Sequence, residues 1–453
     1  MQSPPAAPVT PARVPAPQPA AKGSAKSKPK TAVWRRRVKR ALVTFLVGTP
    51  LAMLLLWYGI HKIPWLGPWL ADAARAVLGP DAVSWVEDRA YRLEDRYNRW
   101  SRRGEAPQAH WDVPPADSTP PPVPEPPGTA GTTPGADDAG LATLDGGGAS
   151  AGDASAVARD VPFHPKKVGP LLPEVAAKGD GIWVPVADPG HPGASTVLYK
   201  TLLHVDAKRP WAELYVVAMD VRALHFMAVA GTKEPIASTR EGQAYPRGKK
   251  GIVPDADRDA LVAAWNGGFK AEHGQLGMAV DGVTLLPPKK TACTVAAYKD
   301  ASGEESLRVG TWSKLEPTAS TMTWWRQGPS CLVEDGAIHP GLANEEAMSW
   351  GSAVGGDTVI RRSALGLSAD GDTVFVSVSN HTTARAIALG MKHVGAVSVV
   401  QLDVNWSYPH FVLFKRGSGG QREGQLLFDG FVYHKGEYTV NPTTRDFFYV
   451  TRR

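Results

Sequence analysis

The chain has 453 residues, of which 43% are apolar and 21% are charged. This composition is typical of globular proteins, and the length suits two or three domains. With 40 prolines and 46 glycines, part of the chain is expected to be unfolded linker. Only two cysteines are present, which excludes a disulfide-dense scaffold, a zinc ribbon and an iron–sulfur protein.

The net charge of +6 comes from one end of the chain. Residues 1–40 contain ten Lys/Arg and no Asp/Glu, whereas residues 161–453 contain 31 basic and 29 acidic residues. The part expected to fold is therefore close to neutral. Nucleic-acid binding requires a basic patch on the folded domain itself, so we expect no nucleic-acid partner.

Residues 41–60 form an uncharged apolar run, long enough as a helix to cross a bilayer. Basic residues at 35–40 precede the run, which predicts a signal anchor with its N-terminus in the cytoplasm. The rest of the chain would then lie in the periplasm or outside the cell. A cleaved signal peptide and a buried core helix are the alternatives.

Composition divides the remainder into further segments. Residues 1–33 predict a disordered basic tail, residues 34–70 the anchor with its flanks, and residues 104–160 a Pro/Gly/Ala-rich linker. Residues 71–103 mix aromatic and charged side chains, and predict a juxtamembrane helical segment that is either solvated or partnered. The outer domain is expected to span 161–453.

Short β-rich runs dominate the outer domain. A D-G turn within 277–286 predicts a hairpin, and S-A-D-G-D at 368–372 predicts a similar turn. One helix is predicted from about Thr383 to Val394, with Gly395 ending it. The expected fold is α+β, mostly antiparallel sheet with few helices. Strands are predicted at 196–205, 212–221, 223–230, 261–265, 277–286, 373–378, 398–402, 411–414 and 447–450.

Cys293 and Cys331 both lie in the outer domain. An oxidising compartment would allow a disulfide between them, but the sequence does not show that they are close enough to bond. A disulfide and two separate buried thiols both remain open.

Three segments carry polar residues where a binding site would need them. The first, A-W-N-G-G-F at 264–269, is a strand that ends in a turn where the backbone can approach a ligand closely. In the second, at 361–367, a guanidinium could hold a phosphate. The third is a buried-looking strand at 399–407 that ends in D-V-N-W-S.

In this order, these segments resemble the motifs of the phosphodiester glycosidase family. The family's N-G-G-F-F turn corresponds to NGGFK at 266–270, and its G-P-x-L-V-x-D-G segment to GPSCLVEDG at 328–336. Its R-T-A-x-G segment corresponds to RSALG at 362–366. Its G-A-x-x-A-x-x-L-D-G-G-G-S segment corresponds to GAVSVVQLDVNWS at 395–407. The resemblance covers roughly residues 260–415.

The resemblance implies an envelope-facing hydrolase that acts on a sugar-1-phosphate diester. We expect no cofactor, and no ligand cluster in the sequence requires a metal, although a cation near Asp403 remains open. The implied partners are a glycan or sugar-phosphate substrate, and the membrane through residues 41–60. The predicted catalytic residues are Asp403 facing the sugar, Arg362 as the phosphate clamp and Glu272 as a second carboxylate. The predicted substrate-binding residues are Asn266, Gly267, Gly268, Asn405, Trp406 and Ser407.

The chain also departs from the family pattern. Val404, Asn405 and Trp406 replace the glycine triplet that follows Leu-Asp, and Lys270 replaces the second Phe of the turn. In the family pattern, glycines at these positions would let the backbone approach a ligand closely. In this chain, side chains occupy the same positions. The alternative is a catalytically inactive glycan-binding or structural envelope module with the same fold.

The anchor prediction can be tested by fractionating the source cells and sizing the protein. We expect the full-length chain in the membrane fraction. A soluble form shortened by about 70 residues would contradict the anchor and indicate a cleaved signal peptide.

Overall fold

The structure is a computed structural model that describes residues 66–113, 162–245, 250–343 and 357–453, and scattered residues of 39–63. The chain divides into two compact units, residues 1–69 and 70–453. Within the described residues, no helix has both the length and the apolar character that crossing a bilayer requires. The predicted segment 41–60 is described only in part. The predicted tail 1–33 and most of the linker lie outside the described residues.

The strands form three sheets, and every pairing between these strands in the described chain is antiparallel. An eight-stranded sheet has the order β1 (Val184–Pro185), β2 (Leu198–His204), β3 (Glu213–Asp220), β14 (Thr373–Ser379), β13 (Arg362–Ser368), β15 (Ala396–Val404), β11 (Val333–Glu334), β12 (Ala337–Ile338).

A second sheet has the order β7 (Val283–Leu286), β6 (Met278–Val280), β10 (Met322–Gln327), β8 (Cys293–Lys299), β9 (Glu305–Thr311). A third has the order β17 (Arg422–Leu426), β16 (Phe411–Arg416), β5 (Leu261–Asn266), β18 (Phe447–Arg452), β4 (Leu224–Val229). The α-helices are α2 (Leu66–Leu78), α3 (Pro80–Ser101), α5 (Arg240–Gln243), α6 (Trp312–Leu315) and α7 (Ala384–His393). Short 3-10 turns lie at 173–175, 255–260, 316–321, 340–342 and 418–420.

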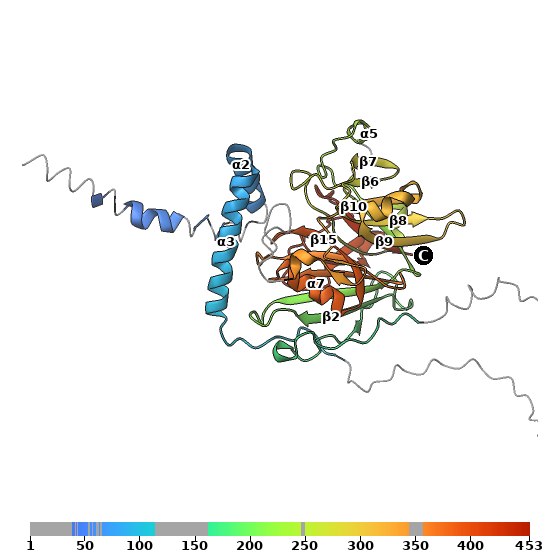
Figure 1. Cartoon of the computed structure of the whole chain (residues 1–453), viewed down its shortest axis with the longest axis horizontal. Coiled ribbons are helices and arrows are strands. Elements are labelled where there is room, and N and C mark those ends of the chain that lie inside the picture. Colours follow the sequence, from blue (N-terminus) through green and yellow to red (C-terminus); the bar gives the residue numbers. More distant parts are fainter. Residues whose placement is uncertain are drawn as a thin grey trace, which may run out of the picture. The chain divides into compact units, whose positions relative to one another are not determined.

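Both faces of the eight-stranded sheet are covered, which explains why its central strands are apolar almost throughout. Side chains alternate between the two faces of a strand. In β3, Val217 therefore joins the core shared with the other two sheets, while Val216 joins the core under α7. Figure 1 shows α7 lying across this sheet near β2 and β15. The mostly antiparallel α+β prediction is confirmed.

The local turn signals also correspond to the structure. Asp281 and Gly282 have φ values of 51° and 74° in the β6–β7 hairpin, and Gly371 has φ 79° between β13 and β14. Thr383 caps α7 by accepting from the Ala386 backbone N–H at 3.1 Å. Gly395, at φ 105°, ends that helix as predicted.

Residues 71–103, which the sequence predicts to be a juxtamembrane segment, pack against the folded body through α3. Asp95 of α3 is buried and accepts from Arg209 of the outer domain at 2.6 and 2.8 Å. Tyr91 packs against the apolar cluster that contains Phe269 and Val404. Further along, residues 105–113 also contact the domain, and Trp111 packs against its main core. The compact unit therefore begins at Leu70, well before the predicted boundary at 161.

The two cysteines form a disulfide, which decides between the two alternatives that the sequence leaves open. Cys293 opens β8, and Cys331 lies two residues before β11. The bond therefore joins the second sheet to the edge of the eight-stranded sheet. The two residues are 38 apart in sequence, so the crosslink restricts a sizeable loop in the unfolded chain.

Replacing both cysteines by alanine is expected to lower the free energy of unfolding by about 2–4 kcal/mol. Denaturant unfolding of the oxidised protein and the variant would measure this. A reducing agent should destabilise the wild type to a similar extent and leave the double variant unchanged. Equal stability of the oxidised and reduced wild type would contradict the expectation.

Candidate functional site

The N-G-G turn at 266–268 follows β5 and touches two other predicted segments. The Asn266 side-chain amide donates to the Ser363 hydroxyl at 2.7 Å, and that hydroxyl donates to the Asp403 carbonyl at 2.9 Å. The Asp403 backbone N–H donates to the Gly267 carbonyl at 3.1 Å. Residues 266, 363 and 403 thus come together at the ends of β5, β13 and β15.

The Asp403 side chain is buried beside a cation. Its carboxylate accepts from Arg445 at 2.6 Å and from the Asn405 side-chain amide at 3.1 Å. Arg445 also donates to the Gly268 carbonyl at 3.3 Å, and its guanidinium lies 4.5 Å from the centre of the Tyr408 ring. The ion pair therefore contacts the N-G-G turn from one side.

A second buried ion pair lies on the other side of the turn. Arg326, from β10, donates to the Asp446 carboxylate at 2.8 Å, and each side chain is 1% exposed. Asp446 also accepts from the Gly268 N–H at 2.9 Å through its carboxylate, and from the Gly267 N–H at 2.9 Å through its carbonyl. We call Arg326, Asp446, Arg445 and Asp403 the buried charge network.

The glycines of the turn are required because this network lies so close. A Cβ on Gly267 would lie 2.3 Å from the Asp446 carboxylate, and one on Gly268 would lie 2.7 Å from the Arg326 guanidinium carbon. Neither position has room for a side chain. In this structure, the two glycines let the backbone of the turn lie close to the buried side chains of Asp446 and Arg326.

The charge states of the network follow from its burial and its pairing. Burial raises the pKa of Asp403, and Arg445 opposes that shift. Burial by itself would lower the pKa of Arg445. The nearby Asp403, Tyr408 and Asp446 outweigh this effect, so the pKa of Arg445 is raised. This pairing therefore favours the charged form of Arg445.

Arg362 faces away from this cluster. Neighbouring residues of a strand point to opposite faces of the sheet, so Ser363 reaches the turn and Arg362 does not. Its guanidinium is fully buried and donates to the carbonyls of Thr382 at 3.1 Å and Thr358 at 2.9 Å. Burial lowers its pKa to about 10. A phosphate clamp at Arg362 does not fit this arrangement, because the side chain is enclosed by protein.

Three further predicted site residues, Glu272, Asn405 and Trp406, differ in their exposure and in their contacts. Glu272 lies past the turn, 3.5 Å from His273 and 3.7 Å from Lys270, with 39% of its side chain exposed. The Asn405 side-chain oxygen accepts from the backbone N–H groups of Ser407 at 2.9 Å and Tyr408 at 2.6 Å, and so shapes the turn after β15. Trp406 is half-buried, and its carbonyl accepts from Arg361 at 2.7 Å.

Sequence reasoning missed Arg326, Arg445, Asp446 and Tyr408. Two signals were available. Arg326 is a lone charge in the apolar strand M-T-W-W-R-Q, and Arg445-Asp446 directly precede the strand F-F-Y-V. A charge inside an apolar strand requires a buried partner. The sequence does not show that these charges, from segments far apart in the chain, pair around one turn.

Asn266 keeps one buried polar atom without a hydrogen bond in the described chain, its side-chain oxygen. An unsatisfied buried acceptor is costly, and such atoms are often found at ligand-binding or catalytic positions. Within the described residues, no group of three or more His, Cys, Asp or Glu is placed to hold a metal ion.

No family model matches the chain, and no curated protein matches it. Among solved structures, it is similar to the catalytic domain of zebrafish N-acetylglucosamine-1-phosphodiester alpha-N-acetylglucosaminidase, auto-inhibited by its pro-peptide. That match has 13% identity and a TM-score of 0.36, and covers 64% of this chain and 95% of the other.

Two bacterial structures are similar at the same level. A hypothetical protein from Synechocystis has 10% identity and a TM-score of 0.33, covering 57% of this chain and 62% of the other. The putative exported protein from Burkholderia pseudomallei K96243 has 12% identity and a TM-score of 0.32, covering 58% of this chain and 76% of the other. All three scores are below 0.5, so we draw nothing from them about activity or site residues.

Gly267→Ala is expected to lower the free energy of unfolding by about 1–3 kcal/mol, because the new methyl group would clash with Asp446. Gly169→Ala is the matched control, since a Cβ there meets no atom within 4 Å. Denaturant unfolding of both variants would test this. Wild-type stability of Gly267→Ala would show that the network does not require a glycine at this position.

Proposed function

We propose that the outer domain hydrolyses a sugar-1-phosphate diester at Asp403, and that residues 41–60 anchor it in the membrane with the domain in the periplasm or outside the cell. One observation carries the proposal: the polar residues of the three motif segments converge beside a buried Asp–Arg pair. The order of the four sequence motifs supports the same reaction class.

The reaction would break the bond between the anomeric carbon and the phosphate oxygen. Water supplies a hydroxyl to the sugar and a proton to the released phosphomonoester. The transition state resembles an oxocarbenium ion, which a carboxylate stabilises or attacks. Asp403 is the proposed carboxylate.

Arg445 takes the role that the sequence suggests for Arg362. It lies 2.6 Å from Asp403 and is the cation of the network closest to that carboxylate. A guanidinium offers paired N–H groups that match two phosphate oxygens, and can stabilise the charge of the leaving group. Asn266 would position the substrate through its unpaired side-chain oxygen.

A second candidate is a glycan-binding or structural module without catalysis. Asp403 is only 2% exposed, and Val404, Asn405 and Trp406 stand where the family pattern has glycines. Tyr91 of α3 packs against the apolar cluster that includes Val404, the residue next to Asp403. These contacts limit access to the carboxylate and favour this alternative.

Hydrolysis of a chromogenic sugar-1-phosphate diester by the purified full chain tests the two candidates. We expect turnover by the wild type and a loss of about 100-fold or more in Asp403→Asn, which keeps the shape of the carboxylate. Thermal unfolding of the variant would verify that it is folded.

Asp335→Asn is the matched control, because this carboxylate is 79% exposed and pairs only with Lys314 among the described residues. It should retain full activity. Turnover that survives Asp403→Asn would contradict the site. Binding of glycans without turnover would contradict the enzyme and support the second candidate.

A further inference from the structure

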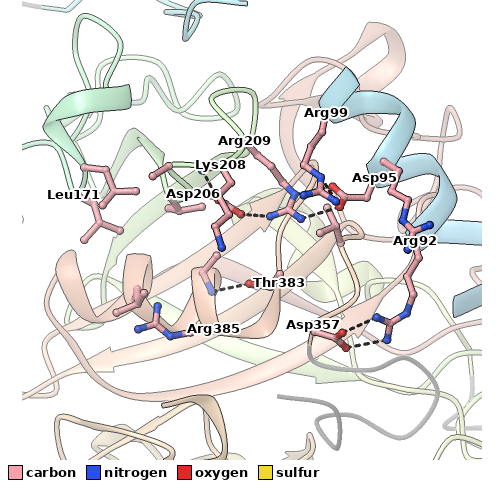
Figure 2. Close-up of a pocket in the computed structure, with 17 residues that line it drawn as sticks. Arg92, Asp95, Arg99, Leu171, Asp206, Lys208, Arg209, Asp357, Thr383 and Arg385 are labelled. Atoms are coloured by element: carbon pink, nitrogen blue, oxygen red, sulfur yellow. Dashed lines mark hydrogen bonds and ion pairs between the residues drawn. The ribbon is translucent and has the colours of Figure 1, made fainter. Parts of the chain in front are cut away.

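A cavity of about 670 Å³ lies apart from the buried charge network. Its walls come from α3, from the turn at 205–209 after β2, from residues 357–359 and from the first turns of α7 (Figure 2). None of its lining residues belongs to the N-G-G turn or to the network. Six of them are cationic: Arg92, Arg96, Arg99, Lys208, Arg209 and Arg385.

Three carboxylates also line the cavity, and arginines neutralise each of them. Asp95 accepts from Arg209 at 2.6 and 2.8 Å, and Arg99 lies 3.2 Å from it. Arg209 also binds Asp206 at 2.6 Å. Figure 2 shows Arg209 bridging these two carboxylates.

Asp357 binds Arg92 at 2.8 Å across the cavity wall. The acidic side chains are therefore fully engaged, and they fix the positions of three of the arginines. Six cations against three carboxylates leave a formal excess of three positive charges around the cavity.

Arg385 contributes most directly to that excess. Its Nε is buried and has no hydrogen-bond partner in the described chain, and Figure 2 shows it at the cavity without an interaction. Arg385 is the second residue of the ten-residue helix α7, whose N-terminus carries a partial positive charge. Arg96 is exposed, and no ion pair with a described residue involves it.

We propose that this cavity binds a soluble ligand bearing a phosphate or diphosphate group, held between Arg385 at the start of α7 and Arg96 on α3. Its volume is that of a small-molecule site, large enough for a sugar phosphate or a nucleotide. Guanidinium groups from two elements match phosphate oxygens in pairs, and the helix N-terminus adds to the attraction. The ligand also ties α3 to the outer domain.

Calorimetric titration of the purified full chain with inorganic pyrophosphate tests this proposal. We expect saturable binding with a Kd below about 1 mM. Arg385→Gln and Arg96→Gln should each weaken binding about tenfold, which is the usual effect of losing one charge-assisted hydrogen bond. Arg89→Gln is the matched control on the same helix. Arg89 lies over Trp85, outside the cavity, so this variant should bind like the wild type.

The remaining outcomes decide against the proposal. Equal binding by the Arg385→Gln, Arg96→Gln and Arg89→Gln variants would show only diffuse attraction to surface charge. No heat with pyrophosphate, together with binding to vesicles that contain anionic phospholipid, would assign the cavity to a membrane surface and overturn a soluble ligand. Chromogenic diester hydrolysis should be unaffected in Arg385→Gln. Absence of diester hydrolysis by the wild type would contradict the proposed Asp403 site and would leave the proposal for this cavity unaffected.

Discussion

Two buried ion pairs, Asp403–Arg445 and Arg326–Asp446, enclose the N-G-G turn, and the arrangement of the site depends on them. Burying a charge is costly unless a partner and further hydrogen bonds compensate it. Here each carboxylate has a guanidinium at 2.6–2.8 Å, and backbone groups of the turn meet both pairs. The turn can lie there only because glycines occupy 267 and 268.

This arrangement changes how the motif is interpreted. A glycine-rich turn at the end of a strand suggests a backbone that approaches a ligand. In this protein the same glycines admit Asp446 and Arg326, so the motif first serves the packing of the domain. Asn266, which retains an unpaired side-chain oxygen, is fully buried, whereas the Asn405–Ser407 turn is half-buried.

The fold was largely predictable because local patterns determine most of its elements. The D-G turn, the Thr383 cap and Gly395 each act over a few residues, so their effects can be derived without knowing the tertiary structure. Strands β8, β9, β10 and β17 and the two-residue strands β1, β11 and β12 were missed. The segment at 361–367 was taken as a site rather than as the central strand β13. Strand pairings between distant segments leave little local signal.

The site was predictable only in part for a related reason. Asn266 and Asp403 lie together, but the choice of Arg362 depended on the direction of a side chain in β13. One residue of strand register moves a side chain to the opposite face, and Ser363 occupies the face that Arg362 was expected to occupy. Arg326 lies in β10 and Arg445 lies just before β18, and the neighbours of these segments in space cannot be derived from spacing alone.

A double-mutant cycle on Arg326 and Asp446 tests most directly whether buried pairing organises the site. Arg326→Met and Asp446→Asn are each expected to lower the free energy of unfolding by about 3–5 kcal/mol, because each leaves an uncompensated buried group. The double variant should lose less than the sum of the two, by about 2 kcal/mol or more. Additive losses within about 0.5 kcal/mol would contradict the account, since they would show that the two charges do not stabilise one another.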